Sequence, residues 1–145
     1  MSVEGLEAVQ ALSSGDMRRC LNILQATSMA HPDGRIEADD VYACTGQPRP
    51  SDVERLAHSL LNEPFAAALG CLRSLQAERG LALADLLRAL LPLLLRLHVP
   101  APVKAAVLES LAEAEAGLSK VTGERMQAAA TVGAFAAARH AVTHQ

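Results

Sequence analysis

Aromatic side chains are nearly absent from this chain of 145 residues, which contains no tryptophan, one tyrosine and two phenylalanines. Half of the residues are nevertheless apolar, and leucine and alanine supply most of them. Both are strong helix formers, whereas the β-branched residues that favour strands are few. The composition therefore predicts an all-α protein, and the length suits one compact domain or two small ones.

The chain also lacks an excess of basic residues, because 16 Asp and Glu outnumber 13 Lys and Arg and the formal net charge is −3. A protein that grips nucleic acid by itself normally presents a basic face. The charge balance therefore argues against a free-standing nucleic-acid-binding protein. It still permits a small local cluster, such as Arg18 and Arg19.

The sequence contains few cysteines, and they are widely spaced. The three cysteines (Cys20, Cys44 and Cys71) are odd in number and form no CxxC motif. This usage predicts reduced and mostly buried thiols in an intracellular protein. The first residues show no basic region followed by an apolar block, so no secretory leader is expected.

One long apolar run, residues 81–99, resembles a membrane span in its leucine content. Asp85, Arg88 and Arg96 interrupt it, and each of these charges would be costly at the centre of a bilayer. A helix buried on most of its sides fits the run better, and we expect no membrane segment.

Motifs of self-contained enzymes are missing. The sequence has no P-loop, no Gly-x-Ser-x-Gly elbow and no His-Glu-x-x-His pattern. His140 and His144 are four residues apart and could hold a metal, but such a pair at the end of a helix is more often a solvated face. We therefore predict no catalytic residue and no metal site.

Apolar periodicity and helix-capping signals predict eight helices. Pro92 lies inside the sixth and should bend it. The stretch TGQPRPSD (45–52) is the best domain boundary, with a stiff proline pair between two helices, and it separates residues 1–47 from 48–145. The expected helices cover about 3–12, 16–27, 37–44, 52–62, 64–79, 82–97, 103–118 and 123–145.

The same periodicity predicts which side chains face inward. In the first helix these are Val3, Leu6, Val9 and Leu12, and in the second they are Met17, Leu21 and Leu24, with Ile23 beside them. Further along the chain Cys44, Phe65, Leu91, Met126, Val132 and Phe135 are also expected in the core.

Two adjacent arginines, Arg18 and Arg19, lie in the first turn of the second predicted helix, where the helix dipole disfavours cations. They could be a solvated pair. Alternatively, one guanidinium contacts a phosphate, whose oxygens suit its planar, always charged fork. An anion at this position also gains from the helix N-terminus. Successive residues on a helix differ by about 100° in direction, so we expect one arginine to face a ligand and the other to face solvent.

An ordered set of motifs carries a resemblance that covers essentially the whole chain. Gly-Asp-Met-Arg (15–18), followed by Leu-Asn-Ile-Leu-Gln (21–25), resembles the second-sensor helix of AAA+ clamp-loader subunits. The later motifs are VYACTGQPRPSD (41–52), LLN (60–62) with Phe65, RGLALADLL (79–87), LAEAE (111–115) and ERMQ (124–127). Together they resemble the C-terminal half of a eukaryotic replication factor C small subunit, most closely subunit 5.

The resemblance implies a small three-helix AAA+ lid over residues 1–47 and a five-helix collar domain over residues 48–145. Arg18 matches the family's second-sensor arginine, which contacts the terminal phosphate of ATP bound to the same subunit. Arg19 has no assigned role and is taken as structural. The nucleotide-binding core is expected ahead of residue 1, so ATP would be bound mainly there and this chain alone would not hydrolyse it.

The implied partners are the other replication factor C subunits through a collar ring, and the sliding clamp and primer-template DNA through the whole complex, in the nucleus. The alternative is a free-standing helical adaptor that binds partner helices. The sequence departs from the family pattern at Cys20, Gly117, Pro92 and the late glycine Gly123, and these changes bear on collar geometry.

Overall fold

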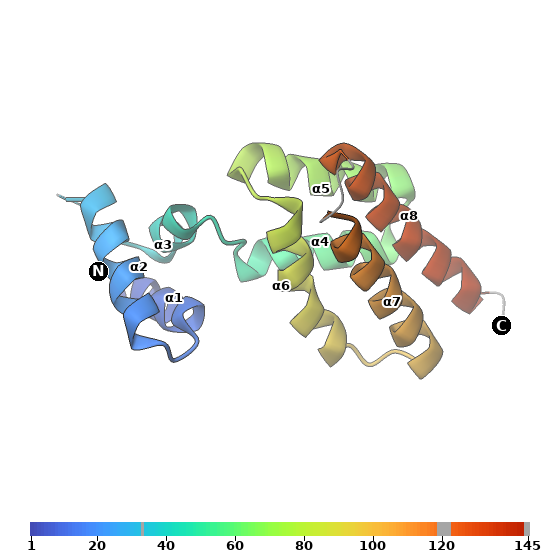
Figure 1. Ribbon diagram of the computed structural model, residues 1–145, viewed down its shortest axis with the longest axis horizontal. Coiled ribbons are helices and arrows are strands. Elements are labelled where there is room, and N and C mark those ends of the chain that lie inside the picture. The colour runs from blue at the N-terminus through green and yellow to red at the C-terminus, as the bar shows by residue number, and fades with distance from the viewer. Residues whose placement is uncertain (33, 119–122, 144–145) are drawn as a thin grey trace. The chain divides into compact units, whose positions relative to one another are not determined.

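The computed structural model describes residues 1–32, 34–118 and 123–143. Within these ranges the chain forms eight α-helices and no strand, which confirms the all-α fold class. Backbone contacts divide it into two compact units, Met1–Arg49 and Pro50–Gln145 (Figure 1). The division falls inside the proline-containing stretch that the sequence marks as a boundary.

Unit 1 contains three helices, α1 (Val3–Ser13), α2 (Met17–Ala30) and α3 (Ala38–Thr45), each in contact with the other two. Their small core consists of Ala8, Val9, Ile23, Ile36 and Val41, with Leu12, Cys20, Leu24, Ala38 and Tyr42 packed around it. The loop before α3 is tied to α1, because the Ser2 amide donates to the Ile36 carbonyl at 2.8 Å.

The faces that α1 and α2 bury agree with the predicted ones only in part. Val9 is buried and Leu12 packs against the core, as predicted, but Val3 and Leu6 are exposed, and Gly5 and Ala8 are buried in their place. The loop at Ile36 crosses α1 so closely that a Cβ atom on Gly5 would lie 3.0 Å from the Ile36 carbonyl oxygen. Only a face of small residues admits this approach, so packing selects that face over the more apolar one.

Helix α2 also buries only part of its predicted face. Ile23 is buried and Leu24 packs against the core, as predicted, whereas Met17 and Leu21 are exposed and Thr27, which was not predicted, is buried. The Thr27 hydroxyl donates to the Ile23 carbonyl at 2.8 Å, which satisfies this buried polar group within the helix. Buried polar residues of this kind are invisible to a pattern of apolar residues alone.

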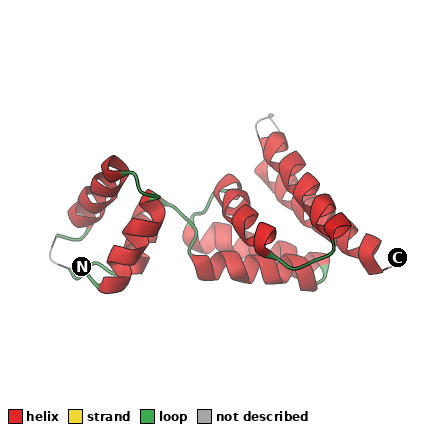
Figure 2. Cartoon of the chain, turned by 90° about the horizontal axis from the view of Figure 1, so that it is seen from below, coloured by secondary structure: helices red, strands yellow, loops and turns green. Residues whose placement is uncertain are grey.

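Unit 2 contains five helices, which Figures 1 and 2 show as α4 and α5 running crosswise to α7 and α8. Its core is a leucine cluster completed by Val132 and Phe135 of the last helix, as predicted. Helix α6 continues through Pro92, which is exposed. The helices are α4 (Pro50–Asn62), α5 (Phe65–Arg79), α6 (Leu83–Arg96), α7 (Ala101–Leu118) and α8 (Glu124–Thr143).

Several single-residue expectations about the core are wrong. Phe65, Leu91 and Met126 are exposed rather than inward-facing. None of the three cysteines is fully buried: Cys44 is exposed, and Cys20 and Cys71 are half-buried.

Candidate functional site

The turn that precedes α2 is held by its own polar groups. Ser14 and Gly15 adopt positive φ angles of 49° and 84°, which reverses the chain between α1 and α2. Asp16 then caps α2, because its Oδ1 accepts from the amides of Arg18 at 2.9 Å and Arg19 at 3.2 Å. The carboxylate also places a negative charge at the positive end of the helix dipole, which offsets the two arginines.

The side chains of Arg18 and Arg19 are exposed at this helix start. Among the residues that the structure describes, neither guanidinium has a carboxylate within ion-pair distance. Since Asp16 occupies the two backbone amides, an anion arriving here would meet a guanidinium rather than the helix N-terminus. Of the two, Arg18 lies on the side of α2 away from the buried Ile23 and Thr27, so its guanidinium is an exposed donor on a helix whose opposite face is anchored in the core.

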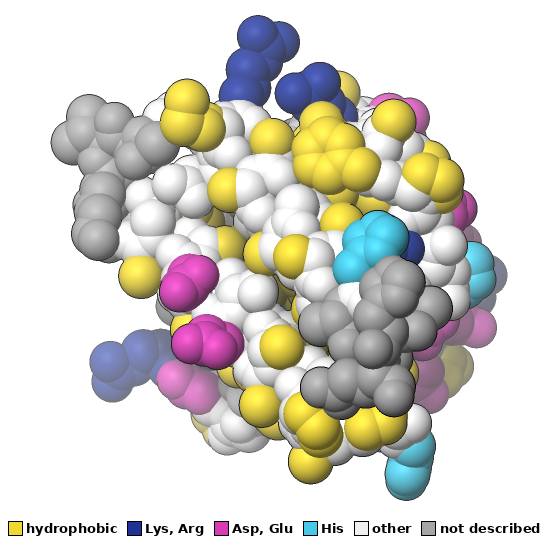
Figure 3. All heavy atoms as spheres, turned by 90° about the vertical axis from the view of Figure 1, so that its right-hand side faces the viewer, with side chains coloured by type: hydrophobic (Ala, Val, Ile, Leu, Met, Phe, Trp, Pro, Cys, Tyr) yellow, Lys and Arg dark blue, Asp and Glu magenta, His cyan; other side chains and the backbone are white. Residues whose placement is uncertain are grey.

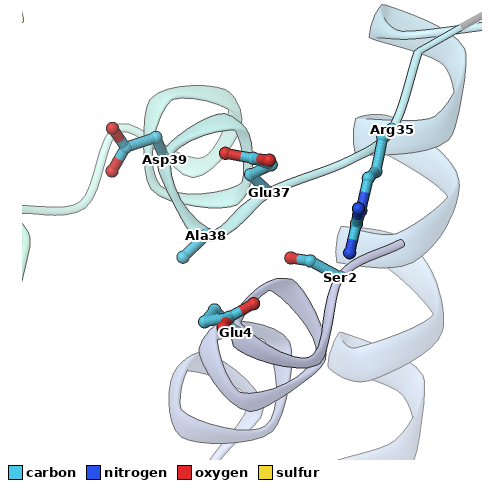
Figure 4. A pocket seen from close by; sticks show the side chains of 6 residues that line it. All are labelled: Ser2, Glu4, Arg35, Glu37, Ala38 and Asp39. Atoms are coloured by element: carbon cyan, nitrogen blue, oxygen red, sulfur yellow. The ribbon is translucent and has the colours of Figure 1, made fainter.

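A polar pocket of about 480 Å³ lies elsewhere in unit 1, at the starts of α1 and α3 (Figure 4). The side chain of Arg35 extends beside Ser2, and Glu4, Glu37 and Asp39 supply three carboxylates. Neither Arg18 nor Arg19 lines this pocket. With carboxylates in the majority, its lining does not suit a phosphate group.

Two motifs that lie far apart in the sequence meet in unit 2. Helix α6 begins after Ala82, whose side chain cannot cap it. Glu124, the first residue of α8, provides the cap: its Oε1 accepts from the Leu83 amide at 2.9 Å and from Gln76 Nε2 at 2.9 Å. The first residue of ERMQ thereby holds the start of the helix that begins within RGLALADLL. The sequence analysis did not predict this contact. A hint of it in the sequence is that Ala82, the residue before α6, has no side chain that can cap the helix.

The start of α4 and the end of α5 are joined by a second polar contact. Asp52 is buried, and its Oδ2 lies 4.0 Å from Arg79 Nε. At the other end of α4, Arg139 of α8 donates to the Glu63 carbonyl at 2.6 Å. These contacts tie the crossing helices of unit 2 into one body.

Unit 2 also leaves apolar side chains exposed. Leu91 and Leu95 lie on α6 with 41% and 53% of their surface accessible, beside a groove that α6 forms with α7. Figure 3 shows the side of the molecule on which α7 and α8 lie, where apolar side chains are scattered between backbone and polar atoms. Leu91 and Leu95 are four residues apart and therefore neighbours on α6, whereas apolar side chains that are scattered singly are normal on a protein surface.

The described part of the chain contains few features that indicate a titratable site or a metal site. The pKa of Tyr42 is raised because burial disfavours the charged phenolate. The described residues contain no cluster of three or more His, Cys, Asp or Glu that could hold a metal ion. His144 lies outside the described residues, so the His140–His144 pair is not placed. No helix among the described residues is long and apolar enough to cross a membrane.

Comparison with known proteins decides the family. Residues 48–134 match the family described as replication factor C C-terminal domain. The chain belongs to the replication factor C family. This match runs from just before α4 into α8, and so includes the Glu124 cap and the α6–α7 groove.

Full-length relatives extend the similarity to unit 1. Replication factor C subunit 3 of rice is 38% identical over 138 residues, which is 95% of this chain and 38% of that protein. Human replication factor C subunit 5 is 38% identical over 139 residues, which is 96% of this chain and 40% of that protein. The chain thus spans about two fifths of the length of these replication factor C relatives, and the predicted resemblance is confirmed.

Proposed function

We propose that this chain serves as the lid and collar part of a replication factor C subunit, within a clamp loader that places a sliding clamp on primer-template DNA. The observation that carries the proposal is similarity over both units to replication factor C subunits 3 and 5. Residues 48–145 would form the collar and assemble with the other replication factor C subunits. Such a complex would act in the nucleus, in DNA replication and repair.

Residues 1–47 would form the AAA+ lid and sense ATP through Arg18. The support is geometric: the Arg18 side chain is exposed, and α2 is anchored through Ile23 and Thr27 on its other face. ATP would be held mainly by a nucleotide-binding core of the kind found in the family, with the Arg18 guanidinium reaching its terminal phosphate. The chain itself would contribute no catalytic residue and no ATP turnover.

The sensor role is tested by grafting this chain behind a complete nucleotide-binding core and replacing Arg18 by Ala. Arg19→Ala is the matched control, because both residues are exposed and both donate their amides to Asp16. We expect Arg18→Ala to weaken ATP binding about 10-fold or more, as loss of a charge-assisted contact would. Equal ATP affinity and clamp loading in the two variants would refute the assignment of Arg18.

The collar role is tested separately, by co-expression of the chain with the other small subunits of a replication factor C complex. We expect co-purification as one assembly in stoichiometric amounts. A chain that stays alone, or that binds isolated helices of unrelated sequence instead, would favour the helical adaptor. Measurable ATP turnover by the purified chain would contradict the non-catalytic role.

A further inference from the structure

A polar hollow of about 430 Å³ lies between α4 and α5 in unit 2. It contains Cys71, the one cysteine in the sequence of unit 2. A cysteine sulfur is the strongest nucleophile among the side chains in this hollow, so the chemistry open to it depends on what surrounds the thiol. The lining consists of Arg55, His58 and Ser59 of α4, Glu63 just after α4, and Cys71 and Ser74 of α5.

The Cys71 side chain is held by the core and still reached from the hollow. It is half-buried, packs against the leucine cluster of unit 2 and also lines the hollow. The Ser74 hydroxyl donates its proton to the Cys71 carbonyl at 3.0 Å, so it does not donate to the sulfur. Fully buried thiols are inert because reagents cannot approach them, whereas a partly exposed thiol reacts. Cys71 therefore combines a fixed position with access for a small reagent.

The charges that line the hollow favour an anionic reagent. Arg55 and His58 are three residues apart on α4 and exposed, so they lie on one side of that helix. Within residues 1–32, 34–118 and 123–143, neither has a carboxylate within ion-pair distance. Glu63 is the one carboxylate in the lining, and it accepts a hydrogen bond from the Ser59 hydroxyl. The Arg55 guanidinium is thus left to bind a carboxylate of an incoming molecule.

We propose that Cys71 is a site of reversible modification by small anionic disulfides such as oxidised glutathione. The Cys71 thiol releases its proton to solvent, and its sulfur attacks one sulfur of the reagent. The reagent's S–S bond breaks, a new S–S bond joins Cys71 to one half of it, and the other half leaves as a thiolate that takes up a proton. The reagent is thus the oxidant, with Cys71 oxidised and the leaving half reduced. This reaction does not depend on the function proposed above.

Cys44 on α3 provides a contrast within the same chain. It is more exposed than Cys71, so accessibility alone predicts that it reacts faster with every disulfide. Asp40 lies four residues before Cys44, one helical turn away, and its carboxylate repels an anionic reagent. The charges therefore predict that an anionic disulfide is favoured at Cys71 relative to Cys44, when each is compared with an uncharged reagent.

Reaction of the folded, reduced full chain with oxidised glutathione or with the uncharged hydroxyethyl disulfide tests the proposal. Mass spectrometry of proteolytic fragments gives the rate at each cysteine separately. The rate with oxidised glutathione is divided by the rate with the uncharged reagent, which removes the difference in accessibility between the two thiols. At low salt we expect this ratio to be at least about 3-fold higher at Cys71 than at Cys44, the size expected of exposed charge contacts, and to approach equality at high salt.

Two arginine variants test whether the hollow directs the reaction. Arg55→Gln should lower the ratio at Cys71 about 3-fold and leave the rate with the uncharged reagent unchanged. Arg73→Gln is the matched control, because Arg73 is exposed and only two residues from Cys71 but does not line the hollow. It should leave the ratio unchanged, and circular dichroism should show equal helicity. An unreactive Cys71, a ratio no higher than at Cys44, or equal effects of the two variants would each overturn the proposal.

Discussion

The cap that Glu124 places on α6 leads to a prediction that only the folded chain suggests. Replacing Glu124 by Ala removes the acceptor of two hydrogen bonds, one from the Leu83 amide and one from the Gln76 side chain. The Leu83 bond is partly buried, whereas the Gln76 bond is exposed and contributes less. Loss of a helix cap costs about 1 kcal/mol, and the lost charge and second bond raise the expected destabilisation to about 2 kcal/mol.

Two conservative variants separate the causes of this loss. Glu124→Gln keeps one oxygen that can accept both hydrogen bonds but removes the charge, so it should cost about 0.5 kcal/mol. Glu124→Asp keeps the charge at the start of α8 but is one methylene too short to reach Leu83, so it should cost about 1 kcal/mol. Arg125→Ala, a change at the exposed neighbouring residue, should alter stability by less than about 0.5 kcal/mol.

Thermal unfolding followed by circular dichroism measures these differences, which correspond to a fall of about 10 °C in the melting temperature of unit 2 for Glu124→Ala. Hydrogen exchange at the Leu83 amide is the specific readout, because that amide loses its acceptor in the Ala and Asp variants and keeps it in the Gln variant. If Glu124→Ala were as stable as Arg125→Ala and the Leu83 amide exchanged at an unchanged rate, the capping argument would be refuted.

Three further changes test other local features. Asp16→Ala should cost about 1 kcal/mol by uncapping α2, whereas Asp16→Asn should retain most of the cap, as urea unfolding would report. Gly5→Ala should destabilise the chain by about 1 kcal/mol or more, because its Cβ would lie 3.0 Å from the Ile36 carbonyl oxygen. Gly70→Ala, which has open space around it, should instead stabilise α5 by about 0.5 kcal/mol. Equal melting temperatures of these two variants would contradict the close approach at Gly5. Because burial raises the pKa of Tyr42 above 10.0, the unfolded chain ionises first and stability should fall as the pH rises above 10; Tyr42→Phe should remove this component of an alkaline unfolding curve.

Local signals account for most of the secondary structure. Asp16 indicates the start of α2, because its short side chain can accept hydrogen bonds from the first amides of a helix. The structure contains the bonds from the amides of Arg18 and Arg19. Gly46 and Gly80 end their helices with φ angles of 64°, a conformation that glycine adopts without a steric penalty. Capping residues of this kind act over three or four residues, so they can be recognised in the sequence before any tertiary contact is known.

The two candidate sites, Arg18 and the α6–α7 groove, also differ in how far the sequence predicts them. Arg18 could be singled out from the sequence, because its motif and its position in a first helical turn are local features, although its role in ATP sensing is still a prediction. The α6–α7 groove could not be found from the apolar pattern, which assigned Leu91 to the core. How much of Leu91 is exposed depends on how much of α6 is covered by α7. The packing of the two helices sets that coverage.

The amino-acid sequence by itself determined that the chain is helical, where the helices begin and end, and which family it resembles, since these depend on residue types and short spacings. Only the tertiary structure decided that α1 buries Gly5 and Ala8 rather than Val3 and Leu6, that α2 exposes Met17 and Leu21, and which carboxylate caps α6. The reason is physical: a helix with apolar residues on several sides has several faces of similar hydrophobicity, and the partner that approaches most closely selects among them. For α1 that partner is the carbonyl group of Ile36, and for the start of α6 it is Glu124, 41 residues away from the amide it caps.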